Sequence, residues 1–469
     1  MKKHIYLFMF IMAAVMASCS SDDSSEIDEN EPVEPGELIF TASTDNLGGT
    51  RTSIDSKKIR WTQGDLISIF NKCSSNDRYQ LVEGNGETNG KFKLAEKSGS
   101  TSSMSFADNV AVYPYNKDYV ISGTPDGYKI ENIVVPAEQV YETNNFSKGS
   151  MPMVAVSKGT NLSFKNVGGL LKLNLKSVNG TIKLDKIILR GRNDEIIAGK
   201  STVTIGSDGI PSIKMSPDGS KTITLDCGLT ELSEKDPTTI YIAVPAINLE
   251  NGFIVDVYDE YSNKITLKAK SKGIQRNHIL LMPEIKYDAY WVDLGLPSGI
   301  KWASRNIGAN SPKDYGNYYA WGNIEPYSSK PNSSMDGKDA QDISGDITHD
   351  VATLKLGGSA RMPRHSDFSE LYNNDNKCTF SYTTRGDASG LLITGPNGNS
   401  IFLPAAGCYD ENGILGNQNF IGYYWSSTPT EEDVGGNSKA YALGFMGPTP
   451  SDGRHHRNMG QSVRAVSDK

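Results

Sequence analysis

Residues Tyr290 to Pro326 read YWVDLGLPSGIKWASRNIGANSPKDYGNYYAWGNIEP and hold three of the five tryptophans of the chain: Trp291, Trp302 and Trp321. Glycine, proline and asparagine recur between these aromatic residues. Trp and Tyr bury large areas, yet their N–H and O–H groups still need hydrogen-bond partners. The stretch therefore predicts a compact module with an aromatic core and a backbone made mostly of loops.

Two later runs belong to the same predicted module. They are GYYWSSTP at Gly422 to Pro429 and SVRAV at Ser462 to Val466. The chain has 469 residues, which predicts two or three domains. Its formal net charge is -8. An acidic chain argues against nucleic acid as a partner and against a membrane patch held by charge.

The N-terminus has the features of an export signal. A basic start, Lys2 to His4, precedes the apolar run Ile5 to Val15, which is too short to span a membrane as a helix. The run ends in Met16-Ala17-Ser18-Cys19, which resembles a bacterial lipobox with Cys19 as the lipidated residue. The alternative is an ordinary secretory signal with an incidental cysteine. Residues 20–37 are acidic, with little to bury, and predict a solvated tether.

Four cysteines remain besides Cys19: Cys73, Cys227, Cys378 and Cys408. Their spacing matches no zinc-binding pattern. An exported protein can form disulfides, and Cys378 with Cys408 is the best candidate pair because both lie in one predicted domain. Four buried free thiols remain the alternative.

The region from residue 38 to about 286 has the pattern of an all-β protein. Leu38 to Ser43 predicts a strand, and Ile59 to Phe70 predicts two short strands around the turn Gln63-Gly64-Asp65. Short alternating runs then continue at Val110–Tyr113, Val154–Val156, Leu170–Leu175, Lys183–Leu189, Thr222–Leu225, Ile240–Val244, Ile254–Val257 and Ile265–Ala269. About 250 residues of such strands predict two β-sandwiches in series, joined near Gly159 to Lys165.

The order of these motifs resembles the fimbrillin family of type V fimbrial subunits. The features are the lipobox, FTAS and TRTS near residues 40–53, IRWTQGDLISIF, LSFKNVGGLLKLNLKS at Leu162 to Ser177 and GIQRNHILLMPEI at Gly273 to Ile285. The resemblance implies two transthyretin-like sandwiches, export as a lipoprotein, and removal of the first strand by a protease. The open groove would then accept a β-strand from the neighbouring subunit. On this chain the removed strand would be Leu38 to Ser43, with cleavage between Arg51 and Thr52. The alternative is that Arg51 is a loop arginine and the lipoprotein stays intact.

The last 180 or so residues resemble a second family, the Fibrobacter succinogenes major paralogous domain. The matching sequence motifs are WVDLGLPSGIKWASRNIGA, DYGNYYAWGN, ARMPRHSDFSELYNN, GPNGNSIFLPAAG, GYYWSSTP and SVRAV. It departs from the usual pattern at Ser359 and His365. This resemblance implies an α+β C-type-lectin-like fold. The sequence itself predicts a short helix over Ser366 to Asn373 with Ser366 as its N-cap, and strands over Ser400–Leu403, Tyr441–Phe445 and Ser462–Val466.

No arrangement of residues indicates catalysis, a metal or a cofactor. The chain has no G-x-S-x-G nucleophile motif, and the adjacent His455 and His456 are poorly placed to share a metal ion. Glu325-Pro326 is followed by Tyr327 rather than by the Asn of calcium-dependent lectins. We therefore expect a protein that is not an enzyme. The aromatic residues Trp321, Tyr327, Tyr423 and Tyr424 are candidates for stacking on sugars; the alternative is that the motif tryptophans form the core.

These interpretations combine into one expected organisation. It comprises a lipoprotein signal peptide (1–19), a tether (20–37), two fimbrillin β-sandwiches (38–162 and 163–287) and a C-type-lectin-like domain (289–469). A subunit ending in a folded domain can accept a strand but cannot easily donate one, so we expect a fimbrial tip adhesin that binds host or microbial glycan or surface protein. It would be lipid-anchored in the outer membrane before processing and would reach the cell surface and fimbria. The alternative is a surface-anchored lipoprotein that binds such ligands without entering a filament.

Overall fold

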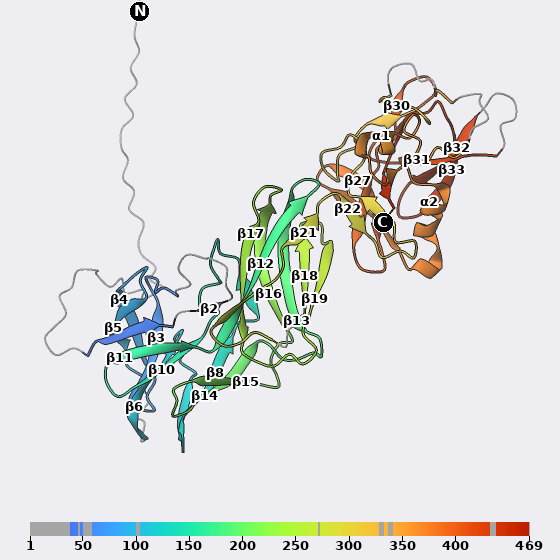
Figure 1. Ribbon diagram of the computed structural model, residues 1–469. Helices are drawn as coiled ribbons and strands as arrows, with labels where there is room; N and C mark the ends of the chain where they lie inside the picture. Colours follow the sequence, from blue (N-terminus) through green and yellow to red (C-terminus); the bar gives the residue numbers. More distant parts are fainter. Residues whose placement is uncertain are drawn as a thin grey trace, which may run out of the picture.

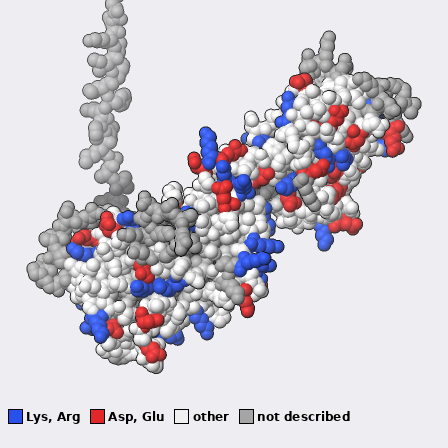
Figure 2. Space-filling model, in the orientation of Figure 1, with Lys and Arg blue, Asp and Glu red and all other residues white. Residues whose placement is uncertain are grey.

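The structure is a computed structural model that describes residues 38–45, 47–49, 59–99, 104–270, 273–327, 333–335, 341–431 and 438–468. Strands dominate, and they form three bodies along an elongated molecule (Figure 1). On the face drawn in Figure 2, basic and acidic side chains are interspersed. Among the described residues, no helix has both the length and the apolar character that a membrane span requires.

The first body is a closed barrel of seven strands. In spatial order these are β1 (Phe40–Thr44), β11 (Asn161–Asn166), β10 (Met153–Ser157), β6 (Ser105–Tyr113), β3 (Leu66–Cys73), β4 (Asp77–Glu83) and β5 (Asn89–Glu96). We expected a β-sandwich here. The sheet closes instead because β1 pairs in parallel with β11 on one side and antiparallel with β5 on the other.

Trp61 fills the interior of this barrel. Its ring lies 5.0 Å from Phe92 and 5.5 Å from Phe164, measured between ring centroids. Its backbone bonds to the turn between β4 and β5, where Trp61 N donates to Glu87 O at 2.8 Å. The prediction of two strands in Ile59 to Phe70 is therefore half wrong: only β3 forms, because the segment around Trp61 joins a turn rather than a ladder.

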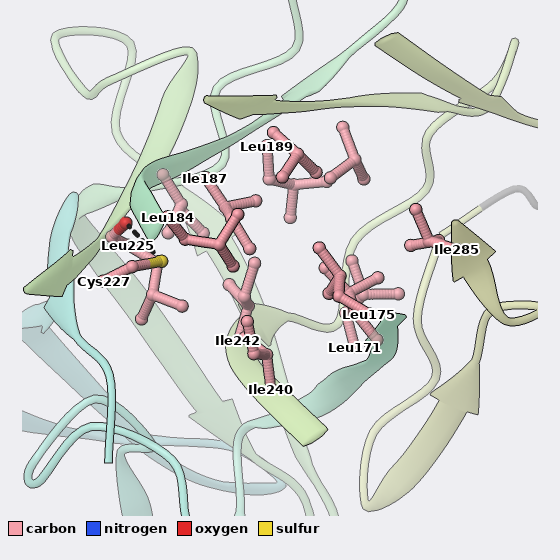
Figure 3. Packing of buried hydrophobic residues seen from close by; sticks show 14 of the residues in the cluster. Leu171, Leu175, Leu184, Ile187, Leu189, Leu225, Cys227, Ile240, Ile242 and Ile285 are labelled. Atoms are coloured by element: carbon pink, nitrogen blue, oxygen red, sulfur yellow. Dashed lines mark hydrogen bonds between the residues drawn. The ribbon is translucent and has the colours of Figure 1, made fainter. Parts of the chain in front are cut away.

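The second body packs two sheets around an aliphatic core (Figure 3). One sheet holds β17 (Thr238–Pro245), β12 (Gly168–Val178), β20 (His278–Leu281) and β2 (Gly48–Gly49), with β21 (Ile285–Asp288) also on β12. The other holds β19 (Lys264–Ala269), β18 (Phe253–Asp259), β13 (Ile182–Gly191), β16 (Thr222–Leu232) and β9 (Glu138–Val140). The eight alternating runs predicted from Val110 to Ala269 all lie in strands, as expected.

The first two bodies exchange strands. The early strands β2 and β9 pair with β20 and β16 of the second body. A further sheet joins β7 (Val120–Thr124) and β8 (Gly127–Val135) to β14 (Gly199–Ile205) and β15 (Pro211–Met215). One hydrophobic cluster contains both Val110 of the barrel and Val203 of β14. The two bodies thus share a core, and the expected boundary between residues 162 and 163 falls inside β11.

The third body is built from short strands, long loops and two small helices. Its strands are β22 (Trp291–Asp293), β23 (Lys301–Ala303), β24 (Tyr318–Tyr319), β25 (Ala360–Arg361), β26 (Thr379–Arg385), β27 (Ala388–Thr394), β28 (Ser400–Pro404), β29 (Cys408–Tyr409), β30 (Leu415–Gly416), β31 (Gly422–Pro429), β32 (Lys439–Phe445), β33 (Pro450–His456), β34 (Gln461–Ser462) and β35 (Val466–Ser467). Trp302, Trp321 and Trp425 are fully buried, which confirms the predicted aromatic core. The single strand expected at Ser462 to Val466 is wrong, because β34 and β35 belong to different sheets.

A carboxylate accepts hydrogen bonds from backbone N–H groups at the start of each helix. Helix α1 (Val351–Leu356) was not expected; it starts at the buried Asp350, whose side chain accepts from Ala352 N and Thr353 N. Helix α2 (His365–Tyr372) begins one residue before the predicted start, so Ser366 is not its N-cap. Arg364 holds that position, and its N–H donates to the Asp367 carboxylate at 2.7 Å. The short η1 (Asn374–Asn376) follows α2.

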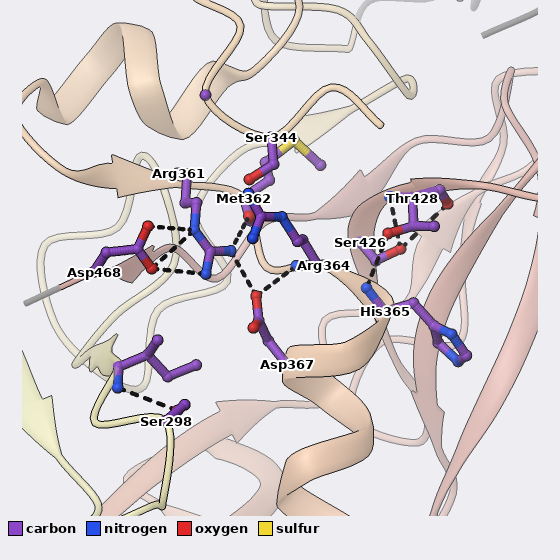
Figure 4. A network of polar contacts seen from close by, with 12 residues as sticks. Ser298, Ser344, Arg361, Met362, Arg364, His365, Asp367, Ser426, Thr428 and Asp468 are labelled. Carbon is purple, nitrogen blue, oxygen red and sulfur yellow. Dashed lines mark hydrogen bonds and ion pairs between the residues drawn. The ribbon is translucent and has the colours of Figure 1, made fainter. Parts of the chain in front are cut away.

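Two buried arginines hold the final segment inside the third body. Arg361 forms ion pairs with Asp367 at 2.5 Å and Asp468 at 2.8 Å (Figure 4). Arg464 is fully buried, and its guanidinium donates to Asn306 Oδ1 at 2.9 Å and to two backbone carbonyls, those of Ala303 and Phe402. These bonds place β35 between β23 and β25.

Candidate ligand-binding surface

Two of the four predicted stacking residues are in the core. Trp321 and Tyr424 are fully buried. Trp321 Nε1 donates to Ser426 O at 2.9 Å, and Tyr424 O–H donates to Pro404 O at 2.7 Å. The prediction that they stack on a ligand is wrong, because both rings and both polar atoms are already used in packing.

The other two candidates, Tyr327 and Tyr423, are partly exposed but lie in different settings. Tyr423 packs against His455, with ring centroids 4.9 Å apart. Tyr327 stacks on Tyr409 at 4.6 Å and an interplanar angle of 21°. The edge of Tyr318 completes this group, with its centroid 5.2 Å from that of Tyr409. Three tyrosines thus meet here: Tyr318 from β24, Tyr327 from the loop after β24 and Tyr409 from β29.

Hydrogen bonds hold these rings in place. Tyr327 O–H donates to Asp410 O at 2.8 Å, and Tyr318 O–H donates to Ala406 O at 2.6 Å. Burial is the main factor that raises the pKa of both Tyr318 and Tyr327 to about 12. Both phenols are therefore neutral near pH 7, and their orientation is set by the backbone rather than by solvent.

An asparagine-rich loop extends the group. Gln418 Nε2 donates to Tyr318 O–H at 3.1 Å. Asn419 Oδ1 accepts from Tyr315 O–H at 2.7 Å, and its own backbone has φ of 65°. Phe420 follows, with 72% of its surface exposed.

We call the set Tyr315, Tyr318, Tyr327, Tyr409, Gln418 and Phe420 the tyrosine surface. It combines partly exposed aromatic faces with an amide, on loops fixed by hydrogen bonds. The neighbouring β30 lies at the upper edge of the third body in Figure 1. Sequence reasoning found only Tyr327. The run DYGNYYAW contained a signal for Tyr315 and Tyr318, whereas Tyr409 and Gln418 come from a distant segment.

The remaining predicted sites are the possible metal ligands, the two adjacent histidines and the processing residues. Within the parts of the chain that the structure covers, no group of three or more His, Cys, Asp or Glu side chains is arranged to hold a metal ion. His455 and His456 lie on β33, where Gln461 and Glu411 are their respective polar neighbours. Cys19, Arg51 and Thr52 lie outside the described residues.

The expected Cys378–Cys408 disulfide is not present. Both residues are free thiols, as are Cys73 and Cys227. Cys378 packs beside the hydrophobic cluster around Trp302, whereas Cys408 lies on β29, so each thiol is accommodated by packing. Burial is the main cause that raises the pKa of Cys408 to about 11 and that of Cys227 to about 12.

Strand β1 is the second functional candidate. Phe40 and Ala42 on its inner face are fully buried, and Trp61 Nε1 donates to Ala42 O at 3.2 Å. Beyond its end, Asp45 pairs with Lys165 at 3.4 Å and with Arg276 at 3.5 Å. Without β1, the barrel would have two unpaired strand edges and an open apolar site where Phe40 now lies.

Comparisons with known proteins give no family assignment. No family model matches the chain, and no curated protein matches it in sequence. Neither resemblance drawn from the sequence is thus confirmed at the level of a family.

Some solved structures are similar to parts of the chain. A protein assigned to cell adhesion from Bacteroides ovatus is 12% identical, with 54% of this chain and 92% of that chain covered and a TM-score of 0.34. The C-terminally truncated tip fimbrial protein Mfa3 from Porphyromonas gingivalis is 11% identical, with 52% of this chain and 94% of that chain covered and a TM-score of 0.22. A fimbrial protein from Bacteroides ovatus is 10% identical, with 92% of this chain and 99% of that chain covered and a TM-score of 0.21. These neighbours are described as fimbrial or cell-adhesion proteins. TM-scores this low do not establish a shared fold.

Proposed function

We propose that the protein is a fimbrial tip subunit and adhesin. It is exported as a lipoprotein with Cys19 lipidated, and it is processed between Arg51 and Thr52. The first two bodies correspond to the transthyretin-like fimbrillin domains, the first of them closed by β1. The third body corresponds to the C-type-lectin-like domain, and the protein is located at the outer membrane, the cell surface and the fimbria.

The pairing of β1 supports the assembly step. Cleavage after Arg51 would remove β1 from between β5 and β11, and β2 from its place beside β20. The exposed edges and the empty site of Phe40 would then accept a strand from the neighbouring subunit.

The position of β35 is the single observation that carries the placement at the tip. β35 pairs with β23 and β25, and Asp468 beside it pairs with the buried Arg361. A strand engaged inside its own domain is not available to a neighbour. β35 would therefore not serve as a donor strand, and the third body would present the tyrosine surface to a glycan or a surface protein.

A second candidate function is that of an anchored surface lipoprotein that never enters a filament. The closed barrel favours it, because β1 completes the fold without a partner and Asp45, just past β1, makes two ion pairs.

The N-terminal sequence of the mature protein from cells tests the two functions. We expect a start at Thr52 in protein that co-purifies with filaments. Arg51→Ala should abolish this product, and Arg51→Lys tests whether the protease requires arginine. An intact chain with lipidated Cys19 as the sole species would overturn the tip assignment and favour the anchored lipoprotein.

A further inference from the structure

A cavity lies where the second and third bodies meet. It has a volume of about 400 Å³. The turn after β18 contributes Glu260, Tyr261 and Ser262, and the third body contributes Ser311, Lys313 and Arg385. This junction pocket is separate from the tyrosine surface, with which it shares no residue.

Arg385 is the unusual residue of the junction pocket. Its guanidinium carbon lies 5.1 Å from the centroid of the Tyr261 ring and 5.3 Å from that of Phe402. These two rings, one from each body, hold the group by cation–π contacts. Within the described part of the chain, the guanidinium has no hydrogen-bond or ion-pair partner. A guanidinium has five N–H donors in a planar fork that suits a carboxylate or sulfate.

The carboxylates nearby are already engaged. Asp259, whose charge acts on Arg385, accepts from Tyr261 N at 2.9 Å and from Asn263 N at 2.8 Å. Asp387 pairs with Lys313 at 3.2 Å. Asp314 accepts from Ser311 N at 2.9 Å, and Glu260 accepts from Lys183 N at 3.3 Å. None of them neutralises Arg385 by direct contact.

Ser311 supplies a second, independent observation. Its hydroxyl oxygen is buried and has no hydrogen-bond partner among the described residues. A buried polar atom without a partner costs free energy, so such atoms in native proteins call for an explanation. Ser311 lines the junction pocket, so a bound ligand could pair with this hydroxyl.

We propose that the junction pocket binds the acidic group, a carboxylate or a sulfate, of a sugar residue in an acidic glycan. Arg385 receives the anionic group, and the hydroxyls of Ser262 and Ser311 bond to the sugar. The volume suits one or two sugar residues rather than an extended peptide. The choice of a glycan rests on the proposed adhesive function, whereas the anion preference rests on Arg385 alone.

Calorimetric titration of the full chain tests this assignment. The probes are glucuronic acid, N-acetylneuraminic acid, glucose 6-sulfate and neutral glucose, with an acidic peptide as a further probe. We expect at least one acidic sugar to bind and glucose not to bind. Arg385→Gln should weaken binding about tenfold or more, since it removes a charged hydrogen-bond donor. Carboxylate and sulfate sugars distinguish the two possible anions.

Matched variants keep the test independent of folding and of the tyrosine surface. Ser311→Ala removes a hydroxyl that has no partner, so the fold should be unaffected while affinity falls about threefold. Asn412→Ala, in an exposed loop of the third body outside both the junction pocket and the tyrosine surface, should leave binding of these small probes unchanged. The tyrosine surface is tested separately, by retention of the full chain on a glycan array. Binding of none of the acidic sugars, binding unchanged by both Arg385→Gln and Ser311→Ala, or binding of the acidic peptide alone would overturn the proposal.

Discussion

Asn399 of the third body hydrogen-bonds to Lys264 of the second body on both sides of its amide. Lys264 N donates to Asn399 Oδ1 at 2.8 Å, and Asn399 Nδ2 donates to Lys264 O at 3.2 Å. The next residue repeats the contact, with Ser400 N donating to Asn263 Oδ1 at 2.6 Å. Side-chain hydrogen bonds thus tie the turn between β27 and β28 to the start of the edge strand β19, which fixes the third body on the second.

Asn399→Ala should loosen this junction. The change leaves the N–H and C=O of Lys264 without partners at a half-buried site, which costs about 1–3 kcal/mol. Small-angle scattering of the full chain should show a broader distribution of maximum dimension. Asn412→Ala, in an exposed loop of the same body, is the matched control and should leave the profile unchanged. Identical profiles for both variants would mean that other contacts hold the junction.

Tyr327→Ala should weaken adhesion by the tyrosine surface. Loss of the ring removes the stacking partner of Tyr409, and truncation of an aromatic anchor typically costs about tenfold or more in affinity. Retention of the full chain on a glycan array and on immobilised surface proteins measures the effect. Tyr327→Phe keeps the ring and should bind nearly as the parent does. Equal retention of Tyr327→Ala and the parent would exclude this surface as the binding site.

Phe40→Ala should destabilise the unprocessed chain by about 3–5 kcal/mol, because the side chain is fully buried in the barrel. Urea unfolding measures the loss. Leu38→Ala, at a position that is 42% exposed, should change stability by less than about 0.5 kcal/mol. Protein that starts at Thr52 lacks both residues, so its stability should be the same whichever parent it came from. A destabilised Leu38→Ala would show that the order of β1 extends further than described.

Asp259 should make the second body less stable as pH rises from about 4 to 6. Burial, the largest cause, raises the pKa of its carboxyl from 3.8 to about 6, against hydrogen bonds from Asn263 N and Tyr261 N. The folded state therefore binds the proton more tightly than the unfolded state, and this contribution is lost as pH passes through the folded pKa. A difference of about two between the folded and unfolded pKa values corresponds to about 3 kcal/mol of folding free energy at most. Urea unfolding between pH 4 and 7 should show this decline, and Asp259→Asn should remove it. A slope that persists in Asp259→Asn would assign the effect to another group.

All four described cysteines should be recovered as free thiols. Under non-reducing denaturation, alkylation should add one group to each of Cys73, Cys227, Cys378 and Cys408. In the native state Cys408 and Cys227 should react slowly at pH 8, since burial raises the pKa of both thiols and the thiolate is the reactive form. Mass spectrometry measures both the number of alkylated cysteines after denaturation and the rate of alkylation in the native state. Recovery of Cys378 and Cys408 unlabelled and linked would contradict the free-thiol arrangement.

The strands were predictable where local pattern and final structure agree. Val154 to Val156 and Ile240 to Val244 alternate or run apolar between turn residues, and each became part of a strand with a buried face. Ile59 to Trp61 carries the same pattern, but its backbone bonds to the β4–β5 turn. Local sequence does not reveal that choice, because the competing partner is more than twenty residues away.

The candidate site was predicted only in part for the same reason. Trp321 and Tyr424 have the residue type of a sugar-stacking site, yet both are buried. Which ring of YYAW or GYYW faces outward depends on the strands beside it. Tyr409 and Gln418 follow no local aromatic motif and meet Tyr318 and Tyr327 only through loop closure.

The sequence by itself determined that the described chain is mainly β, that the last body has an aromatic core, and that turns interrupt its strands. These are consequences of residue size, apolar alternation and glycine placement, which act over a few residues. The tertiary structure alone decided that β1 closes a barrel, that β2 and β9 pair in the second body, and that Arg385 lies between Tyr261 and Phe402. Those outcomes depend on which distant edges, rings and charges meet, and such pairings are settled only when the whole chain packs.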